Sequence, residues 1–222
     1  MKFDYQDLVA SSVKGMRLYE TPNGHHYPSI TTVLGQTMPE DKAAALKKWQ
    51  TALGPLADKK SKEATDKGTA VHLMVERYLK NEELIQGNEK IDNSVISAFN
   101  ALKLKLNKIQ EVWGLEVALF SDELGVAGRC DCIGVYKDKP CIIDFKTSSK
   151  IKSSKDIEDY KLQLTAYALM HNEMFDTAIT DGVILMTSEA GFPQEFLVDL
   201  FDYVEPLVER IESFYQKLSS TL

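Results

Sequence analysis

Apolar residues recur along this chain at two spacings, and each spacing is typical of one kind of secondary structure. Where they recur every three or four residues, they fall on one face of a helix. This pattern predicts helices over residues 41–53, 68–79, 92–109, 156–171 and 201–218. The helix over 156–171 is apolar on most sides, which indicates that it is largely buried.

Short apolar and β-branched runs predict the strands, which fall at residues 113–120, 126–135, 141–146, 181–187 and 195–198. Near the N-terminus, Asn23-Gly24 is typical of a hairpin turn, and Ser29 is placed to cap a short helix that stops near Gly35. This order of elements predicts an α/β fold in which helices flank a central mixed β-sheet. Because 222 residues suffice for one packed core, we expect a single domain.

Charged residues interrupt the most apolar of the predicted strands, CIIDFK at residues 141–146. Asp144 and Lys146 share one face of this strand because side chains alternate. The polar segment before it should turn the chain, so that the preceding strand lies antiparallel and brings Asp131 near Asp144. Two carboxylates this close repel each other unless a cation lies between them, and oxygen ligands favour Mg²⁺ or Mn²⁺. An ordinary surface hairpin is the alternative, but it fits poorly because burying these charges without a purpose would be costly.

Two helices and one further strand contribute more candidates. His72 and Glu76 are four residues apart and therefore lie on one face of their helix, although a lone helical histidine is more often structural. Gln163 and Tyr167 share a face of the later helix in the same way. Glu116 either points into the cleft with the two aspartates or faces solvent, and the pattern favours neither.

Residues 58–67 carry four lysines and are either helical or mobile. The segment is a candidate contact for a nucleic-acid backbone. A solvated face, balanced by Asp58, Glu63 and Asp66, is an equally good interpretation.

Composition and charge narrow the class of protein. Apolar residues make up 44% of the chain and charged residues 27%, as in ordinary globular proteins. The net charge of −7 argues against a surface that is positive throughout, but it is compatible with a nucleic-acid enzyme that has local basic patches. The apolar runs are too short to cross a membrane, and the first residues lack the features of a secretory signal or a typical organellar transit peptide. We therefore expect a cytoplasmic protein.

All three cysteines, Cys130, Cys132 and Cys141, lie in the predicted hairpin. An odd count without a secretory signal indicates reduced thiols. Cys130 and Cys132 flank Asp131 and should both point away from it, as small buried hydrophobic residues. Because three cysteines are too few for a four-cysteine iron–sulfur cluster, we expect none within this chain.

Four short motifs, in this order, resemble the RecB-like branch of the PD-(D/E)XK nuclease superfamily. They are Gly-x-x-x-His at Gly68 and His72, Gly-x-x-Asp at Gly128 and Asp131, Asp-x-Lys-Thr at Asp144, Lys146 and Thr147, and Gln-x-x-x-Tyr at Gln163 and Tyr167. Each motif is weak alone, but four in the right order are specific. The run YPSITTVLGQTMPEDKAAALKKWQ is also similar to the mitochondrial genome maintenance exonuclease group and its bacteriophage relatives. Cys130 stands where the superfamily name places proline, a common departure in this branch.

The resemblance implies a restriction-endonuclease-like core and a phosphodiester hydrolase that depends on Mg²⁺, with Mn²⁺ as a substitute. Asp131 and Asp144 would hold the metal with help from the carbonyl of Phe145. His72 and Glu76 would support that metal or a second one.

The resemblance also implies roles in catalysis for three further residues. Lys146 would position or help to deprotonate the attacking water and neutralise developing charge. Gln163 and Tyr167 would shape the site and contact the substrate backbone.

These inferences together predict a metal-dependent DNA exonuclease that acts on single-stranded ends in replication, repair or recombination, with proteins of those pathways as possible partners. Residues 68–222 would form the nuclease core, and residues 1–67 would guide the substrate as a wall or arch. A bacterial virus is the expected source, in which case the location is the host cytoplasm. A structure-selective endonuclease on the same core and a non-catalytic nucleic-acid-binding module are the alternatives, and digestion polarity and DNA versus RNA stay open.

Overall fold

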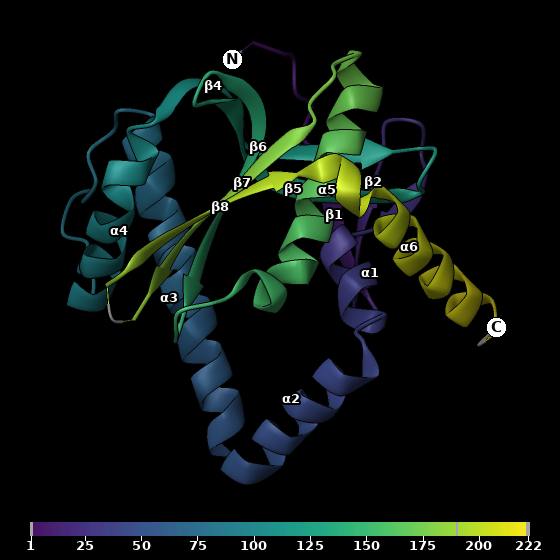
Figure 1. Cartoon of the computed structure of the whole chain (residues 1–222), viewed down its shortest axis with the longest axis horizontal. Helices are drawn as coiled ribbons and strands as arrows, with labels where there is room; N and C mark the ends of the chain where they lie inside the picture. Colours follow the sequence, from purple (N-terminus) through teal and green to yellow (C-terminus); the bar gives the residue numbers. More distant parts are fainter. Residues whose placement is uncertain (1, 190, 221–222) are drawn as a thin grey trace.

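A five-stranded mixed β-sheet forms the centre of the computed structural model, which describes residues 2–189 and 191–220 (Figure 1). Its strands lie side by side in chain order: β4 (Ile109–Ser121), β5 (Val126–Tyr136), β6 (Lys139–Ser148), β7 (Asp181–Ser188) and β8 (Pro193–Asp199). Neighbouring strands are antiparallel except β6 and β7, which are parallel. A parallel pair needs a crossover, and α5 (Glu158–Phe175) supplies it after the short 3₁₀ helix η1 (Ser154–Ile157).

Helices cover both faces of this sheet, and each face has its own apolar core. On one face lie α1 (Ile30–Gln36), α5 and α6 (Val204–Ser219), which follows the 3₁₀ helix η2 (Leu200–Tyr203). On the other face lie α3 (Leu56–Leu79) and α4 (Asn93–Leu106). The predicted α/β fold with a central mixed sheet flanked by helices is therefore confirmed.

A small second sheet precedes α1. It consists of β1 (Val9–Val13), β2 (Met16–Glu20) and β3 (His26–Pro28), and the turn at Asn23-Gly24 joins the last two as predicted. The predicted cap of α1 is also present, since the Ser29 hydroxyl accepts a hydrogen bond from the Thr32 N–H at 3.0 Å. β1 was not predicted, because all five of its residues are exposed and the strand has no apolar alternation.

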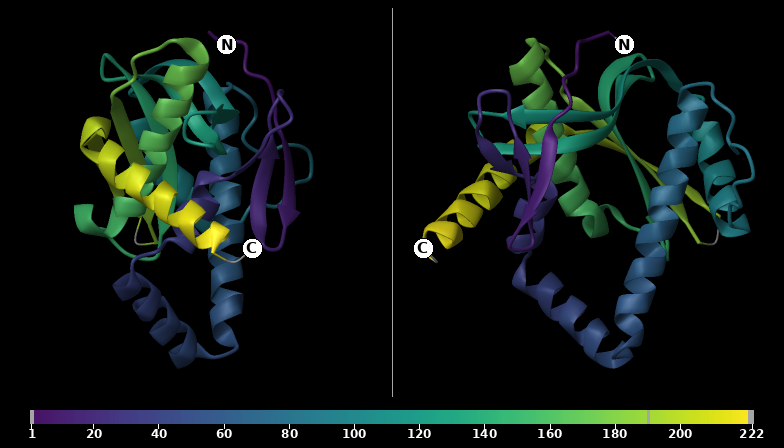
Figure 2. Two further views of the ribbon diagram at one scale, coloured as in Figure 1. Left: turned by 90° about the vertical axis from the view of Figure 1, so that its right-hand side faces the viewer. Right: turned by 180° about the vertical axis from the view of Figure 1, so that it is seen from behind.

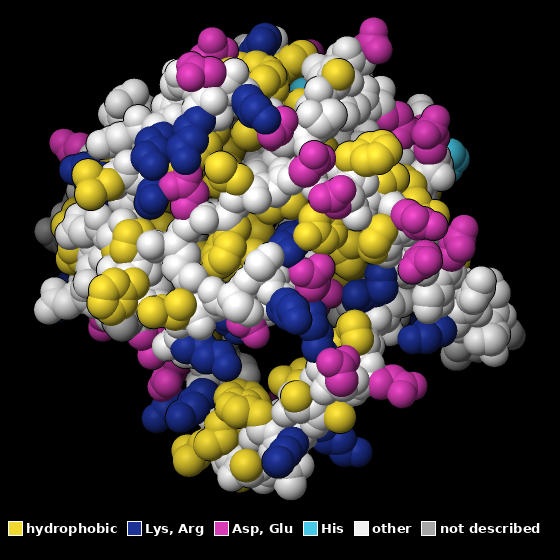
Figure 3. Space-filling view, viewed as in Figure 1, with side chains coloured by type: hydrophobic (Ala, Val, Ile, Leu, Met, Phe, Trp, Pro, Cys, Tyr) yellow, Lys and Arg dark blue, Asp and Glu magenta, His cyan; other side chains and the backbone are white. Residues whose placement is uncertain are grey.

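α2 (Glu40–Leu53) and α3 form a V that projects from the body of the molecule (Figures 1 and 2). α3 is one helix of 24 residues that includes the lysine-rich segment 58–67, so this segment is helical. α2 has no buried residue. In the space-filling view, an opening is visible between the V and the body (Figure 3). We call the V of α2 and α3 the arch.

The arch is fastened to the body at the start of α2. The Lys42 ammonium donates to the Asp159 carboxylate at 3.2 Å, and Arg210 of α6 donates to the other oxygen of Asp159 at 3.1 Å. Asp159 therefore links the first turn of α2 to both α5 and α6.

In the part of the chain that the structure describes, no helix is long and apolar enough to cross a membrane.

Candidate active site

The candidate site lies where β5 and β6 part. The two strands pair from Tyr136 opposite Lys139 to Cys132 opposite Ile143, and the next residue on each strand is Asp131 or Asp144. There the Asp131 side chain replaces a backbone partner in the hydrogen bonding between the strands, because its Oδ2 accepts a hydrogen bond from the Phe145 N–H at 2.9 Å. The split between the strands thus holds both predicted aspartates side by side.

Asp144 and Lys146 form a buried ion pair on one face of β6, as the alternation predicted. Lys146 Nζ donates to Asp144 Oδ1, whereas Asp144 Oδ2 is buried and has no hydrogen-bond partner among the described residues. Burial, only partly offset by the nearby Lys146 charge, raises the pKa of Asp144 to about 6. Burial alone would lower the pKa of Lys146, but the charges of Asp144 and Asp131 outweigh it and raise that pKa. The unpartnered carboxylate oxygen is costly unless it binds a cation or a proton.

His72, on α3, reaches the same split from the other side. Its Nε2 lies 2.6 Å from the Phe145 carbonyl oxygen. Because a carbonyl can only accept, Nε2 carries the proton and Nδ1 is left with its lone pair in the neutral ring. Nδ1 lies 3.6 Å from Asp131 Oδ2 and 4.0 Å from Glu116 Oε1. A lone pair turned toward two carboxylates is the arrangement that a bound cation stabilises.

Glu116 is the residue that the pattern left undecided, and the structure places it in the cleft. Its carboxylate lies with His72 and Asp131 in a group whose ligand atoms are all within 4.8 Å of one another. Burial and the nearby Asp131 charge raise its pKa to about 7. Charged Glu116 interrupts an apolar strand as Asp144 does, and the same argument applied to both would have favoured the cleft.

The backbone at Glu116 is left-handed, with φ at 51°, which is costly for a residue that has a Cβ. The Arg129 guanidinium donates to the Glu116 carbonyl oxygen and to the Asp7 carboxylate, so it holds this conformation from the next strand. Sequence reasoning missed Arg129, because only the backbone conformation reveals what it does.

Glu76 shares a face of α3 with His72, and its carboxylate is paired with a lysine. Glu76 Oε1 accepts a hydrogen bond from Lys80 Nζ at 2.6 Å. The i to i+4 pair with a lysine thus competes with the cleft for this carboxylate. A metal-ligand role for Glu76 stays a prediction, and so does one for the Phe145 carbonyl, one lone pair of which accepts from His72.

Gln163 and Tyr167 lie buried on α5 behind the aspartates. The Gln163 amide donates to the Tyr167 hydroxyl at 3.0 Å, and burial, with a contribution from Asp131 and Asp144, raises the pKa of Tyr167. Gly128 leaves room for the Tyr167 ring, since a Cβ at that position would lie 2.7 Å from a Tyr167 ring carbon. The glycine of the Gly-x-x-Asp motif therefore admits the tyrosine of the Gln-x-x-x-Tyr motif.

The side chains of Cys130 and Cys132 lie on different sides of the sheet, contrary to the expectation. All three are buried, as predicted, and all are free thiols. Cys130, however, packs in the core beside α5, and Cys132 packs in the core beside α3 and α4. The strict alternation of a regular strand fails at Asp131, where β5 leaves β6, so the two flanking side chains do not share a side.

Comparison with known proteins gives a family match over part of the chain. Residues 97–191 match the family described as the PD-(D/E)XK nuclease superfamily. This match confirms the resemblance seen in the motifs. Nucleases of the superfamily use divalent metals, and the His72, Glu116 and Asp131 group could hold one.

Particular relatives are exonucleases by name. The chain is 31% identical over 174 residues to mitochondrial genome maintenance exonuclease 1 of Xenopus tropicalis, and 30% identical over 175 residues to that of Homo sapiens. Each match covers 75% of this chain and 50% of the relative, so the chain spans about half the length of these proteins.

Two solved structures are more loosely similar. SSO0001 has a TM-score of 0.42 at 18% identity and matches 78% of this chain and 70% of its own. A candidate exonuclease from Eubacterium rectale has a TM-score of 0.46 at 10% identity and matches 70% of this chain and 69% of its own.

Proposed function

We propose that this protein is a divalent-metal-dependent exonuclease that hydrolyses DNA from single-stranded ends. The observation that carries the proposal is the convergence of His72 Nδ1, Glu116 and Asp131 next to Asp144, which has one unpartnered oxygen and holds the Lys146 ammonium through the other. Acceptor atoms this close together, and partly withdrawn from water, repel one another unless they bind a cation.

The donor set fits a hard divalent ion. Carboxylates from β4, β5 and β6 supply oxygen ligands, which Mg²⁺ prefers, and the imidazole nitrogen is compatible with Mn²⁺. A bound ion would supply Lewis-acid polarisation of a phosphoryl oxygen and a more acidic water. Asp131 and Asp144 would hold it, with His72 and Glu116 either completing its coordination or holding a second ion.

The chain's own residues would then orient the water and stabilise charge. Asp144 holds the Lys146 ammonium through one carboxylate oxygen, and the ammonium lies 5.1 Å from the ring centroid of Tyr160. A cation fixed between a carboxylate and a ring face is preorganised, so it can orient a water and offset the negative charge that develops on a phosphoryl group. Gln163 and Tyr167, buried on α5, would stabilise the split between β5 and β6 by packing behind it.

The arch supports an exonuclease over an endonuclease. The opening beneath it (Figure 3) would admit a single strand from a free end, and α3 lines it with charged side chains. The names of the relatives favour the same activity. The division into a guiding segment over residues 1–67 and a core over 68–222, a cytoplasmic location, and partners in replication or recombination are parts of this proposal.

Digestion of labelled DNA tests the proposal. Wild-type protein with Mg²⁺ should degrade linear single strands and leave circular single strands intact, and EDTA should stop the reaction. Lys146→Ala should lose most of the activity, whereas Lys139→Ala, an exposed lysine at the far end of the same strand, should retain it. Cutting of circles at a comparable rate would show an endonuclease, and tight DNA binding without metal-dependent cleavage would show a binding module.

A further inference from the structure

A small hydroxyl-lined cavity lies at the C-terminal ends of the parallel strands β6 and β7. Its volume is about 110 Å³. Five hydroxyl side chains contribute to its lining: Thr147, Ser148, Ser149, Thr187 and Ser188. Lys67 of α3 closes one side and Glu189 lies at the end of β7. The carboxyl ends of parallel strands are a common place for ligands to bind in α/β sheets.

Two donors in this lining have no partner. Ser188 is 4% exposed, and its Oγ has no hydrogen-bond partner among the described residues. Lys67 makes no hydrogen bond or ion pair with any residue that the structure describes. A buried hydroxyl without a partner costs free energy, and a ligand in the cavity that accepts its proton would remove that cost.

Size and chemistry select the kind of ligand. The cavity is large enough to hold waters or one tetrahedral oxyanion. Hydroxyl groups and an ammonium are the donors that bind phosphate oxygens in nucleic-acid complexes.

The cavity lies next to the candidate active site along both α3 and β6. Lys67 precedes His72 on α3 by five residues, which is roughly 7.5 Å along a helix. Thr147 follows Phe145 on β6 by two residues, which is roughly 6.6 Å along a strand. Gly68 joins the two elements at this point, since a Cβ there would lie 3.5 Å from Thr147 Oγ1. Both measures suit neighbouring phosphates of one extended strand.

We propose that this cavity binds a backbone phosphate next to the scissile one, with the Ser188 hydroxyl and the Lys67 ammonium as its donors. The proposal rests on the proposed nuclease function. It makes the cavity the place where the register of the strand is fixed before cleavage, because phosphate contacts position a nucleic acid without reading its sequence.

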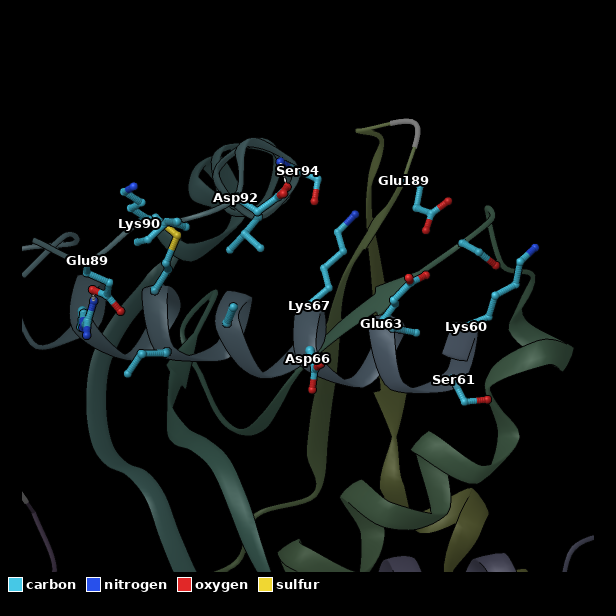
Figure 4. A pocket seen from close by; sticks show the side chains of 18 of the residues that line it. Lys60, Ser61, Glu63, Asp66, Lys67, Glu89, Lys90, Asp92, Ser94 and Glu189 are labelled. Carbon is cyan, nitrogen blue, oxygen red and sulfur yellow. Dashed lines mark hydrogen bonds and ion pairs between the residues drawn. The ribbon is translucent and has the colours of Figure 1, made fainter. Parts of the chain in front are cut away.

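Glu189 opposes this binding, so changes at Glu189 and at Lys67 should have opposite effects on the affinity for the strand. Figure 4 shows Lys67 rising from the same side of α3 as Glu63 and Lys60, with Glu189 across from it, whereas Asp66 points to the other side. A carboxylate at the rim repels a phosphate. Neutralising Glu189 should therefore tighten binding of the strand, while removing the charge of Lys67 should weaken it.

The experiment measures the affinity of a single-stranded oligonucleotide with Ca²⁺ in place of Mg²⁺, after checking that the strand stays intact. One linkage at a time is replaced by a neutral methylphosphonate. In wild type, neutralising one linkage should weaken binding roughly tenfold, as expected for loss of a charge-assisted contact. In Lys67→Met the same replacement should have no further effect, and in Ser188→Ala its effect should be smaller than in wild type. Glu189→Gln should bind the unmodified strand more tightly.

The controls separate this proposal from the nuclease proposal. Lys60→Met changes a lysine of the same helix that does not line the cavity, and it should keep the wild-type response to the methylphosphonate. Ser188→Ala should keep or raise the melting temperature, since it removes an unpartnered hydroxyl.

Each outcome decides one of the two proposals. If Lys67→Met and Ser188→Ala respond to the methylphosphonate as wild type does, while wild type cleaves DNA, the phosphate subsite is wrong and the nuclease proposal stands. If wild type does not bind or cleave DNA, but binds inorganic phosphate in a way that Lys67→Met abolishes, the cavity is a site for free phosphate, and both the nuclease proposal and the strand-positioning role fail.

Discussion

The split between β5 and β6 and helix α2 of the arch are opposites in burial. At the split, ionisable groups are withdrawn from water and left partly unpartnered, as Asp144 Oδ2 shows. On α2, no residue is buried, and the first turn is held to the body through Lys42 and Asp159. The contrast shows that the site keeps buried charges at a cost in stability, whereas α2 is held to the body at its first turn and contributes shape. Substitutions in the two regions should therefore separate activity from stability in opposite ways.

The largest effect is expected at the site itself, from Asp144→Asn. The change should lower the cleavage rate by at least about 10²–10³-fold, because it removes a charged group that a transition state would use. It should leave the melting temperature of the metal-free protein nearly unchanged, because losing the repulsion from Asp131 offsets losing the ion pair with Lys146. Single-turnover cleavage and thermal unfolding in EDTA measure the two quantities. A large fall in melting temperature would contradict the account of the site.

Glu116 provides a sharper test, because it combines an acidic side chain with a strained backbone. Glu116→Gly should weaken Mn²⁺ binding by roughly 10- to 100-fold. It should also stabilise the metal-free protein by about 1 kcal/mol, since glycine accepts the left-handed conformation without strain. Glu116→Gln is the matched control, which should lose metal affinity without the full gain in stability. Calorimetric titration measures the Mn²⁺ affinity, and urea unfolding measures the stability. A destabilised glycine variant would mean that the backbone at Glu116 is not strained.

The same two regions show what the sequence can and cannot predict. Periodicity predicted the helices and the five strands of the main sheet, because these elements bury one face and so carry a pattern. It missed β1, which buries none. Two aspartates and a lysine stood out because charges in an apolar strand are costly. Glu116 stayed undecided and Arg129 was missed, because a left-handed residue within a strand has no sequence signature.

Glu76 shows a further reason for the difference. Helical spacing correctly places Glu76 on the face of His72, but spacing does not determine where a long side chain ends. The carboxylate of Glu76 accepts a hydrogen bond from the Lys80 ammonium at 2.6 Å, so it already has a cationic partner. A site built from three strands and a helix depends on such choices between partners, and they are made in three dimensions.

A smaller effect is expected where the arch joins the body. Asp159→Asn should weaken the hold on Lys42 and Arg210 and lower the free energy of unfolding by about 1 kcal/mol, as for a partly exposed charge pair. The loosened arch should also admit strands without free ends, so the ratio of circular to linear single-strand cleavage should rise. Lys139→Ala, which breaks the exposed pair with Asp181 away from the arch, is the control. An unchanged ratio with the expected loss of stability would show that the arch does not exclude circles.

The smallest effect should come from the arch itself, and the two tryptophans of the chain provide a matched pair. Trp49 on α2 is 39% exposed, whereas Trp113 on β4 is 7% exposed. Trp49→Ala should change the free energy of unfolding by no more than about 0.5 kcal/mol, because little apolar area is buried there. Trp113→Ala should lower it by about 3–5 kcal/mol, because it opens a cavity beside the sheet. Urea unfolding followed by circular dichroism measures both. Similar losses in the two variants would show that α2 packs against the body in solution and that the contrast between the arch and the site is wrong.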